Sequence, residues 1–172
     1  KKDYLEIIRL QSQIENIFYN IDGFYSTDYL LAVKMGLEHC IYHGDINTCG
    51  GEELLQSFLE AFKKFYGVNS YIYTDFVFAI GFYYYMQDDF INERIYINEY
   101  MVLSLELYKA YENKLNETLR TQALDQALYS CRELQTSNIR CKSKGIEISS
   151  KELISTFNYL SYLKGKELTN NR

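Results

Sequence analysis

The residues with the clearest capacity for chemistry lie around two histidines. His39 and His43 are four positions apart, a spacing that places two metal ligands on one face of a helix. Asp45 and Cys49 follow, and their ligand types would complete a tetrahedral site. No HExxH motif surrounds the histidines. We therefore expect both to be solvent-facing residues at a helix end, where the helix dipole favours a protonated His43.

Nucleophilic catalysis is a second chemistry that this segment would allow. Cys40 or Cys49 beside a histidine would form a Cys–His pair, because a nearby base activates a thiol. The adjacency of His39 and Cys40 gives no such geometry, and Asp88 and Asp89 would point in different directions on a helix. The motifs GxxxxGK, GxGxxG and GxSxG are absent from the sequence. The sequence therefore predicts a protein that is not an enzyme and holds no cofactor or metal.

The cysteines follow no metal-binding pattern such as CxxC. We expect buried free thiols, which would suit the reducing cytosol. Two disulfides in a secreted protein are the alternative. The four cysteines are Cys40, Cys49, Cys131 and Cys141.

Aromatic residues are the most unusual feature of the chain, with 18 Tyr and 10 Phe. Most of the set Phe76, Phe78, Phe82 and Tyr100 is expected to fill the core. The three consecutive tyrosines at positions 83–85 cannot all face inward on one helix, so at least one is available to a partner. Tyrosine suits interfaces because it offers rigid contact area with a polar end. The candidate partner-binding residues are Tyr83, Tyr84, Tyr85, Tyr96 and Tyr100.

The elements that position these residues are expected to be helices. Proline, which breaks helix interiors, is absent. Apolar residues recur at three- and four-residue steps, as one face of an amphipathic helix requires. The predicted helices cover approximately residues 3–21, 27–43, 51–66, 74–86, 92–114, 116–134 and 150–165.

Three further segments lack a clear helical period. Residues 71–85 favour strands as much as helices, but strict alternation is missing and a lone strand would have no partner, so a buried helix is expected. The polar stretch 135–145 predicts a connecting loop. Residues 166–172 are expected to form a frayed tail beyond Gly165.

Length and charge exclude several classes of function. A chain of 172 residues fits one domain, here spanning 1–172. The formal net charge is -5, and Lys and Arg are scattered, which argues against nucleic-acid binding. No apolar run approaches the ~18 residues of a membrane span. The start KKDYLEII is too polar for the apolar core of a signal peptide. The expected location is the cytoplasm, where free thiols would stay reduced.

Residues 27–67 resemble the first helices of the poxvirus Bcl-2-like immune modulators. In that family a helix, a short DIxxCG-type loop and a helix with an aromatic ending follow one another. Here the loop is 45–50 and the ending is 65–67. The DFVF motif at 75–78 and the segment 102–128 are similar to later helices of the family, as is the ending ISSKELISTFNYLSYLKGK.

This resemblance implies a single compact Bcl-2-like bundle of about seven helices. It further implies a protein of the host cytoplasm that binds host signalling proteins and blunts innate immune or cell-death signalling, without catalysis. Members of the apoptosis-blocking branch hold an amphipathic helix in a groove, whereas others use exposed helix faces. The helix predicted over residues 3–21 lies outside the resemblance.

The alternative is a tetratricopeptide-like helical repeat, in which antiparallel helix pairs stack and a concave face holds a peptide. The helices predicted over 27–43 and 51–66, and over 74–86 and 92–114, would form such pairs. The segment AIGFYYYMQDDF has the rhythm of a repeat's first helix, although no self-similarity at a 34-residue period is found. Both interpretations predict a partner that is a protein or peptide. Surplus surface tyrosines would also allow a homodimer.

Overall fold

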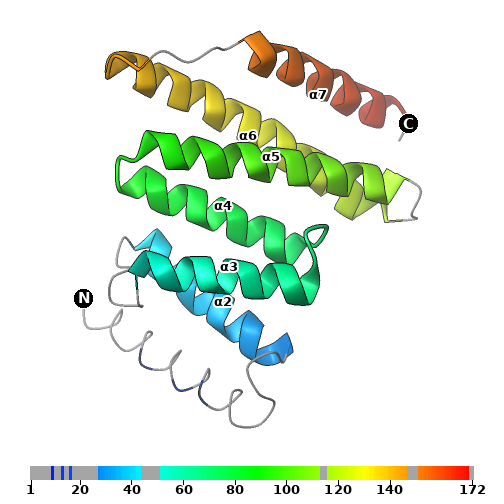
Figure 1. Cartoon of the computed structure of the whole chain (residues 1–172). Coiled ribbons are helices and arrows are strands. Elements are labelled where there is room, and N and C mark those ends of the chain that lie inside the picture. Colours follow the sequence, from blue (N-terminus) through cyan, green and yellow to red (C-terminus); the bar gives the residue numbers. More distant parts are fainter. Residues whose placement is uncertain are drawn as a thin grey trace. The chain divides into compact units, whose positions relative to one another are not determined.

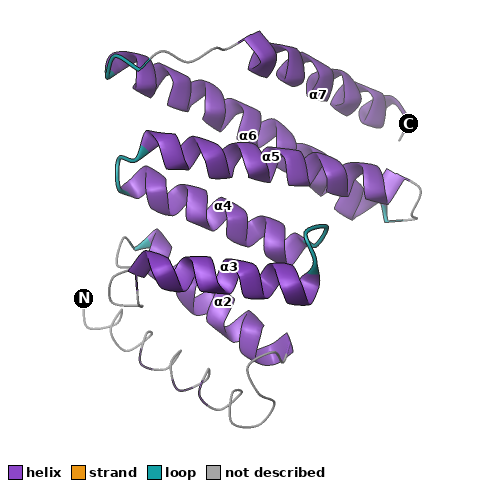
Figure 2. Ribbon diagram, in the orientation of Figure 1, coloured by secondary structure: helices purple, strands orange, loops and turns teal. Residues whose placement is uncertain are grey.

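The chain is all-helical in the part that a computed structural model describes, namely residues 9, 13, 16, 27–43, 51–112, 116–146 and 151–170. These residues form six α-helices and no strand (Figures 1 and 2). The predicted all-α class is confirmed. None of the described helices has the length and apolarity needed to cross a bilayer. The helix predicted over residues 3–21 falls almost wholly outside the described residues.

The chain divides into two compact units, Lys1–Gly67 and Val68–Arg172. The expectation of one domain over residues 1–172 stays a prediction. Unit 1 contains α2 (Thr27–Tyr42) and α3 (Gly51–Tyr66). Unit 2 contains α4 (Tyr71–Met86), α5 (Phe90–Glu112), α6 (Glu117–Ser143) and α7 (Lys151–Asn170).

The described part of unit 1 is built mainly on α2 and α3, whose apolar positions recur with the helical period. The Tyr66 hydroxyl donates a hydrogen bond to the Thr27 carbonyl oxygen at 3.2 Å, which joins the end of α3 to the start of α2. Gly67 ends α3 with a φ of +79°, a conformation that costs glycine little. The large buried side chains of the unit include Leu30, Leu37, Ile41, Leu55, Phe58 and Phe62.

Unit 2 consists of helices that pack in chain order: α4 on α5, α5 on α6, and α6 on α7. Consecutive helices run antiparallel (Figure 1). The segment 71–85 is a helix, as predicted, and its start is capped by Ser70, whose Oγ accepts a hydrogen bond from Tyr73 N at 3.3 Å. The core of the unit includes Phe76, Ile97, Leu107, Leu124, Ala127 and Leu160.

The helices α4 and α5 pack closely at Gly81. A Cβ atom at this position would meet Ile97 Cδ1 at 2.8 Å and Tyr96 Cβ at 3.3 Å. The two helices then connect through a tight turn in which Asp88 has a φ of 56°. Asp89 caps α5 by accepting a hydrogen bond from Asn92 N at 3.1 Å. Both aspartates therefore lie in the turn, between the ranges 74–86 and 92–114 that were predicted as helices.

The prediction of a loop over residues 135–145 is wrong, because α6 continues to Ser143. Ser137, Asn138 and Cys141 are buried and continue the inward face of Leu134 at helical spacing. Arg94 of α5 donates hydrogen bonds to the Leu134 carbonyl oxygen and to Asn138 Oδ1. Contacts with α5 therefore stabilise this buried face of α6. Because the face is largely polar, the spacing of apolar residues does not reveal it.

The expected end of the last helix at Gly165 is also wrong, because α7 continues to Asn170. Glu167 is buried and accepts two hydrogen bonds, from the Tyr108 hydroxyl at 2.8 Å and from Arg120 Nη2 at 2.7 Å. These bonds tie the end of α7 to α5 and α6. They explain why the described part of the expected tail, up to residue 170, is helical.

Candidate functional site

The two histidines form no metal site with other described residues. Their rings lie 4.2 Å apart, and His43 Nδ1 is 2.8 Å from the His39 carbonyl oxygen. His43 is exposed, as expected, but His39 is half-buried, and burial and the nearby His43 lower its pKa. Asp45 and Cys49 lie outside the described residues. Within the described part of the chain, no three His, Cys, Asp or Glu side chains gather as potential metal ligands.

The described cysteines fall into two groups. Cys131 and Cys141 are buried free thiols, as predicted, whereas Cys40 is disulfide-bonded, which corrects the expectation for that residue. Burial raises the pKa of the Cys131 thiol to about 11, and its Sγ lies 3.2 Å from Met101 Sδ. A thiol with so high a pKa is a poor nucleophile at neutral pH.

The five candidate tyrosines lie in different environments. Tyr84 and Tyr100 are buried, at 6% and 5% exposure, and Tyr84 stacks on the half-buried Tyr96 with ring centroids 5.5 Å apart. Tyr83 is also half-buried. Tyr85 is 39% exposed, so at least one of the three consecutive tyrosines is accessible, as expected. Of the five, only Tyr85 lines the pocket described next.

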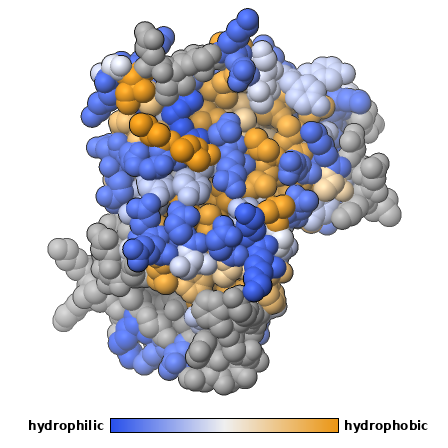
Figure 3. Space-filling model, in the orientation of Figure 1, coloured by the Kyte–Doolittle hydropathy of each residue, from blue (hydrophilic) through white to orange (hydrophobic). Residues whose placement is uncertain are grey.

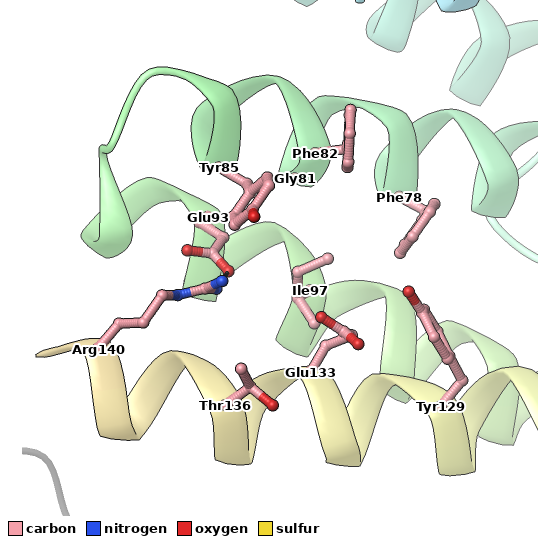
Figure 4. A pocket seen from close by; sticks show the side chains of 10 residues that line it. All are labelled: Phe78, Gly81, Phe82, Tyr85, Glu93, Ile97, Tyr129, Glu133, Thr136 and Arg140. Carbon is pink, nitrogen blue, oxygen red and sulfur yellow. Dashed lines mark hydrogen bonds and ion pairs between the residues drawn. The ribbon is translucent and has the colours of Figure 1, made fainter. Parts of the chain in front are cut away.

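A pocket of about 300 Å³ lies in unit 2 between α4, α5 and α6 (Figure 4). Figure 4 shows side chains of α4 and α6 pointing toward each other, with side chains of α5 between them. Each helix contributes residues at helical spacing, so one face of each helix lines the cavity. These are Phe78, Gly81, Phe82 and Tyr85 from α4, Glu93 and Ile97 from α5, and Tyr129, Glu133, Thr136 and Arg140 from α6.

Aromatic rings form much of the pocket wall. Phe78 of α4 contacts Tyr129 of α6 edge-on, with ring centroids 5.8 Å apart. The rings of Phe82 and Tyr85 also contact each other, with centroids 5.6 Å apart. Tyr85 and Tyr129 are 39% and 47% exposed, so the wall reaches the surface. These two rings are therefore accessible from solvent.

A buried ion pair occupies one end of the pocket. Glu93 is 3% exposed, and Arg140 Nη2 forms an ion pair with Glu93 Oε1. The Arg140 guanidinium also lies over the Tyr85 ring, 4.6 Å from its centroid. Burial raises the pKa of Glu93, although Arg140 and the Ser137 hydroxyl act in the opposite direction. The charged form of this carboxylate is therefore costly even with its partner in place.

A second carboxylate lies near the other end of the pocket. Glu133 is half-buried and interacts with Tyr129, whose pKa is raised by burial and by the nearby Glu133. The described lining thus carries two carboxylates and one guanidinium. With both carboxylates ionised, the charge of the lining side chains is negative.

The raised pKa of Glu93 predicts how stability depends on pH. The pKa of Glu93 is higher in the folded chain than in the unfolded chain. Its contribution to the free energy of unfolding is therefore fully present below the unfolded pKa of about 4.3, and it is lost as the pH rises through the folded-state pKa. Glu93→Gln cannot lose a proton and removes this dependence. We expect the stability of Glu93→Gln relative to wild type to increase between pH 4 and pH 7 in urea titrations. A relative stability that falls over this interval would contradict the assignment.

Most of the pocket was missed by sequence reasoning. Phe78 and Phe82 were expected in the core, and Tyr129, Glu93 and Arg140 were not singled out. The positions of Phe78, Phe82 and Tyr85 on one helical face were a usable signal for the α4 wall. Arg140 was misplaced because residues 135–145 were predicted as a loop.

Exposed apolar side chains also lie outside the pocket. Ile91 and Ile95 of α5 are 63% and 55% exposed, and Tyr162 of α7 is 66% exposed. Figure 3 shows one face of the molecule, where hydrophobic surface is interleaved with hydrophilic surface. These three residues do not line the pocket, whose walls combine apolar surface with convergent polar groups.

No family model matches the chain, and no characterised protein or solved structure matches it significantly.

Proposed function

We propose that this chain is a non-enzymatic protein-binding module and that the pocket between α4, α5 and α6 binds a side chain of a partner protein or peptide. The observation that carries this proposal is the combination of exposed aromatic walls with a few convergent polar groups. Tyr85 and Tyr129 provide partly exposed, amphipathic contact area, which is common where binding energy concentrates.

The chemistry of the lining favours binding over catalysis. The described lining residues include no histidine, which is the commonest general acid or base in enzymes, and no cysteine, which is a strong nucleophile. Glu93, the most buried of its ionisable groups, is paired with Arg140. These residues have the composition of a recognition site.

Two architectures for this module are compatible with an all-helical chain. The packing of α4 to α7 in chain order, with antiparallel neighbours, favours the tetratricopeptide-like alternative, in which a groove between stacked helices holds an extended peptide. The similarity of residues 27–67 to poxvirus Bcl-2-like proteins favours an inhibitor of host signalling. Small-angle scattering separates the two, because a globular bundle of this length has a radius of gyration of about 16 Å. A clearly larger value would favour the repeat.

Filling the pocket tests the binding proposal. Thr136 is exposed on α6 and lines the cavity, so a Thr136→Trp side chain would occupy the space of a ligand. Peptides would be selected on the wild-type chain from a displayed random 12-residue library. We expect Thr136→Trp to weaken their binding at least about tenfold, the effect of losing one good anchoring contact.

The matched control is Gln122→Trp, which adds the same ring at an exposed position of α6 outside the pocket. It should bind the selected peptides within about twofold of wild type, as expected for a neutral surface change. Equal binding by wild type, control and Thr136→Trp would show that the pocket is not the binding site.

A further inference from the structure

The charge of the pocket limits what it can bind. Glu93 and Glu133 face the cavity together with a single cation, Arg140 (Figure 4). An entering carboxylate or phosphate would be repelled by two carboxylates while Arg140 is already paired with Glu93. The whole chain also carries a formal net charge of -5, which attracts basic partners over a longer range. Electrostatics therefore favour a cationic ligand.

The structure contains an internal example of cation binding at this site. The Arg140 guanidinium lies 4.6 Å from the Tyr85 centroid and 5.8 Å from the Phe90 centroid, and it pairs with Glu93. Aromatic faces attract cations through their negative quadrupole, and the neighbouring carboxylate adds a direct charge interaction. The same two kinds of group continue along the pocket in Phe82 and Glu133.

A carboxylate oxygen of Glu93 can accept a hydrogen bond from a ligand in the pocket. Glu93 Oε2 is buried and makes no well-formed hydrogen bond with the described residues, although the Ser137 hydroxyl lies close to this carboxylate. A buried acceptor without a partner costs free energy that a donor from a ligand would recover. An aliphatic ligand would fill the aromatic part of the cavity but would leave this oxygen unsatisfied. A side chain with an apolar stem and several N–H donors satisfies both requirements.

We propose that the pocket between α4, α5 and α6 binds a lysine or arginine side chain of a basic peptide segment. The aliphatic stem of that side chain lies between the aromatic walls, and its charged group lies at the carboxylates. This inference rests on the proposed protein-binding function and specifies the residue that enters the site. A cavity of about 300 Å³ is large enough for one such side chain. Glu133 is its main charged partner, because Glu93 is shared with Arg140.

The test uses the full chain and the peptides selected from the 12-residue library. We expect these peptides to share a basic residue whose replacement by a neutral analogue weakens binding about tenfold or more. Citrulline replaces arginine at nearly the same size, and norleucine replaces lysine with its apolar stem kept and its ammonium group removed. Glu133→Gln should cause a loss of similar size. Glu106→Gln removes the same charge from an exposed position of α5 outside the pocket and should change affinity less than about threefold.

Three outcomes of this test would overturn the proposal that a basic side chain enters the pocket. Selected peptides that lack a shared basic residue, yet lose binding to Thr136→Trp, would overturn the cation proposal and leave the binding function standing. Equal losses in Glu133→Gln and Glu106→Gln would also overturn it, because the attraction would then be a general effect of net charge. A library that yields no binding peptide would overturn both the proposed function and this inference.

Discussion

Replacing Arg140 with alanine is expected to lower the free energy of unfolding by about 3 kcal/mol, the lower end of the range for breaking a buried ion pair. Glu93 would remain 3% exposed without its counter-charge, and its carboxylate would have to be ionised in an apolar site or take up a proton. The Arg140 side chain is 26% exposed, so water entering its place would limit the loss. Urea denaturation at pH 7 measures the effect.

Two control variants separate the ion pair from other roles of Arg140. The double variant Glu93→Leu, Arg140→Leu removes both charges and should be more stable than Arg140→Ala, because apolar groups replace the pair without leaving a buried charge. Lys142→Ala removes an exposed cation from the same end of α6 and should cost less than about 0.5 kcal/mol. A double variant less stable than Arg140→Ala would show that the buried carboxylate is not the source of the cost.

Glu167→Ala is expected to destabilise the chain by about 3 kcal/mol and to release the end of α7. Glu167 accepts hydrogen bonds from the buried Tyr108 hydroxyl and from Arg120, and both donors would be left without this acceptor. Each lost bond to a charged group is worth about 1.5–3 kcal/mol, and solvation of the partly exposed Arg120 reduces the sum. Urea denaturation gives the stability, and amide hydrogen exchange should show faster exchange in the last turns of α7.

Lys166→Ala is the control for this prediction, because Lys166 is an exposed neighbour on the same helix. It should change the stability by less than about 0.5 kcal/mol and leave hydrogen exchange in α7 unchanged. If Glu167→Ala behaved like Lys166→Ala, the assigned contacts between α7 and the helices α5 and α6 would be wrong.

Local sequence patterns predicted the helices well where apolar residues recur with the helical period. The period placed α2 and α3 within one residue at each end, and the absence of alternation correctly made residues 71–85 a helix. Such patterns do not predict the helices where tertiary contacts stabilise polar helical faces. Asn138 and Glu167 continue α6 and α7 through bonds to distant residues. A search for hydrophobic periodicity does not detect such bonds.

The candidate site was less predictable than the fold because it forms between helices. At least one of the three consecutive tyrosines at positions 83–85 was predicted to be accessible, and one of them, Tyr85, lines the pocket. Glu93 and Arg140 are 47 positions apart in the sequence, and only the packing of α6 on α5 brings them together. Their pairing is a property of the tertiary structure, and no local motif marks it.

The most direct test of the central claim is aromatic-ring NMR of the wild-type chain during titration with a peptide selected from the library. If the pocket binds the partner, the largest shifts should fall on the rings of Phe82, Tyr85 and Tyr129, which line it. The exposed Tyr159 and Tyr162 of α7 lie outside the pocket and should remain unshifted. Shifts confined to these two α7 tyrosines, with the pocket rings unchanged, would contradict the proposed binding site.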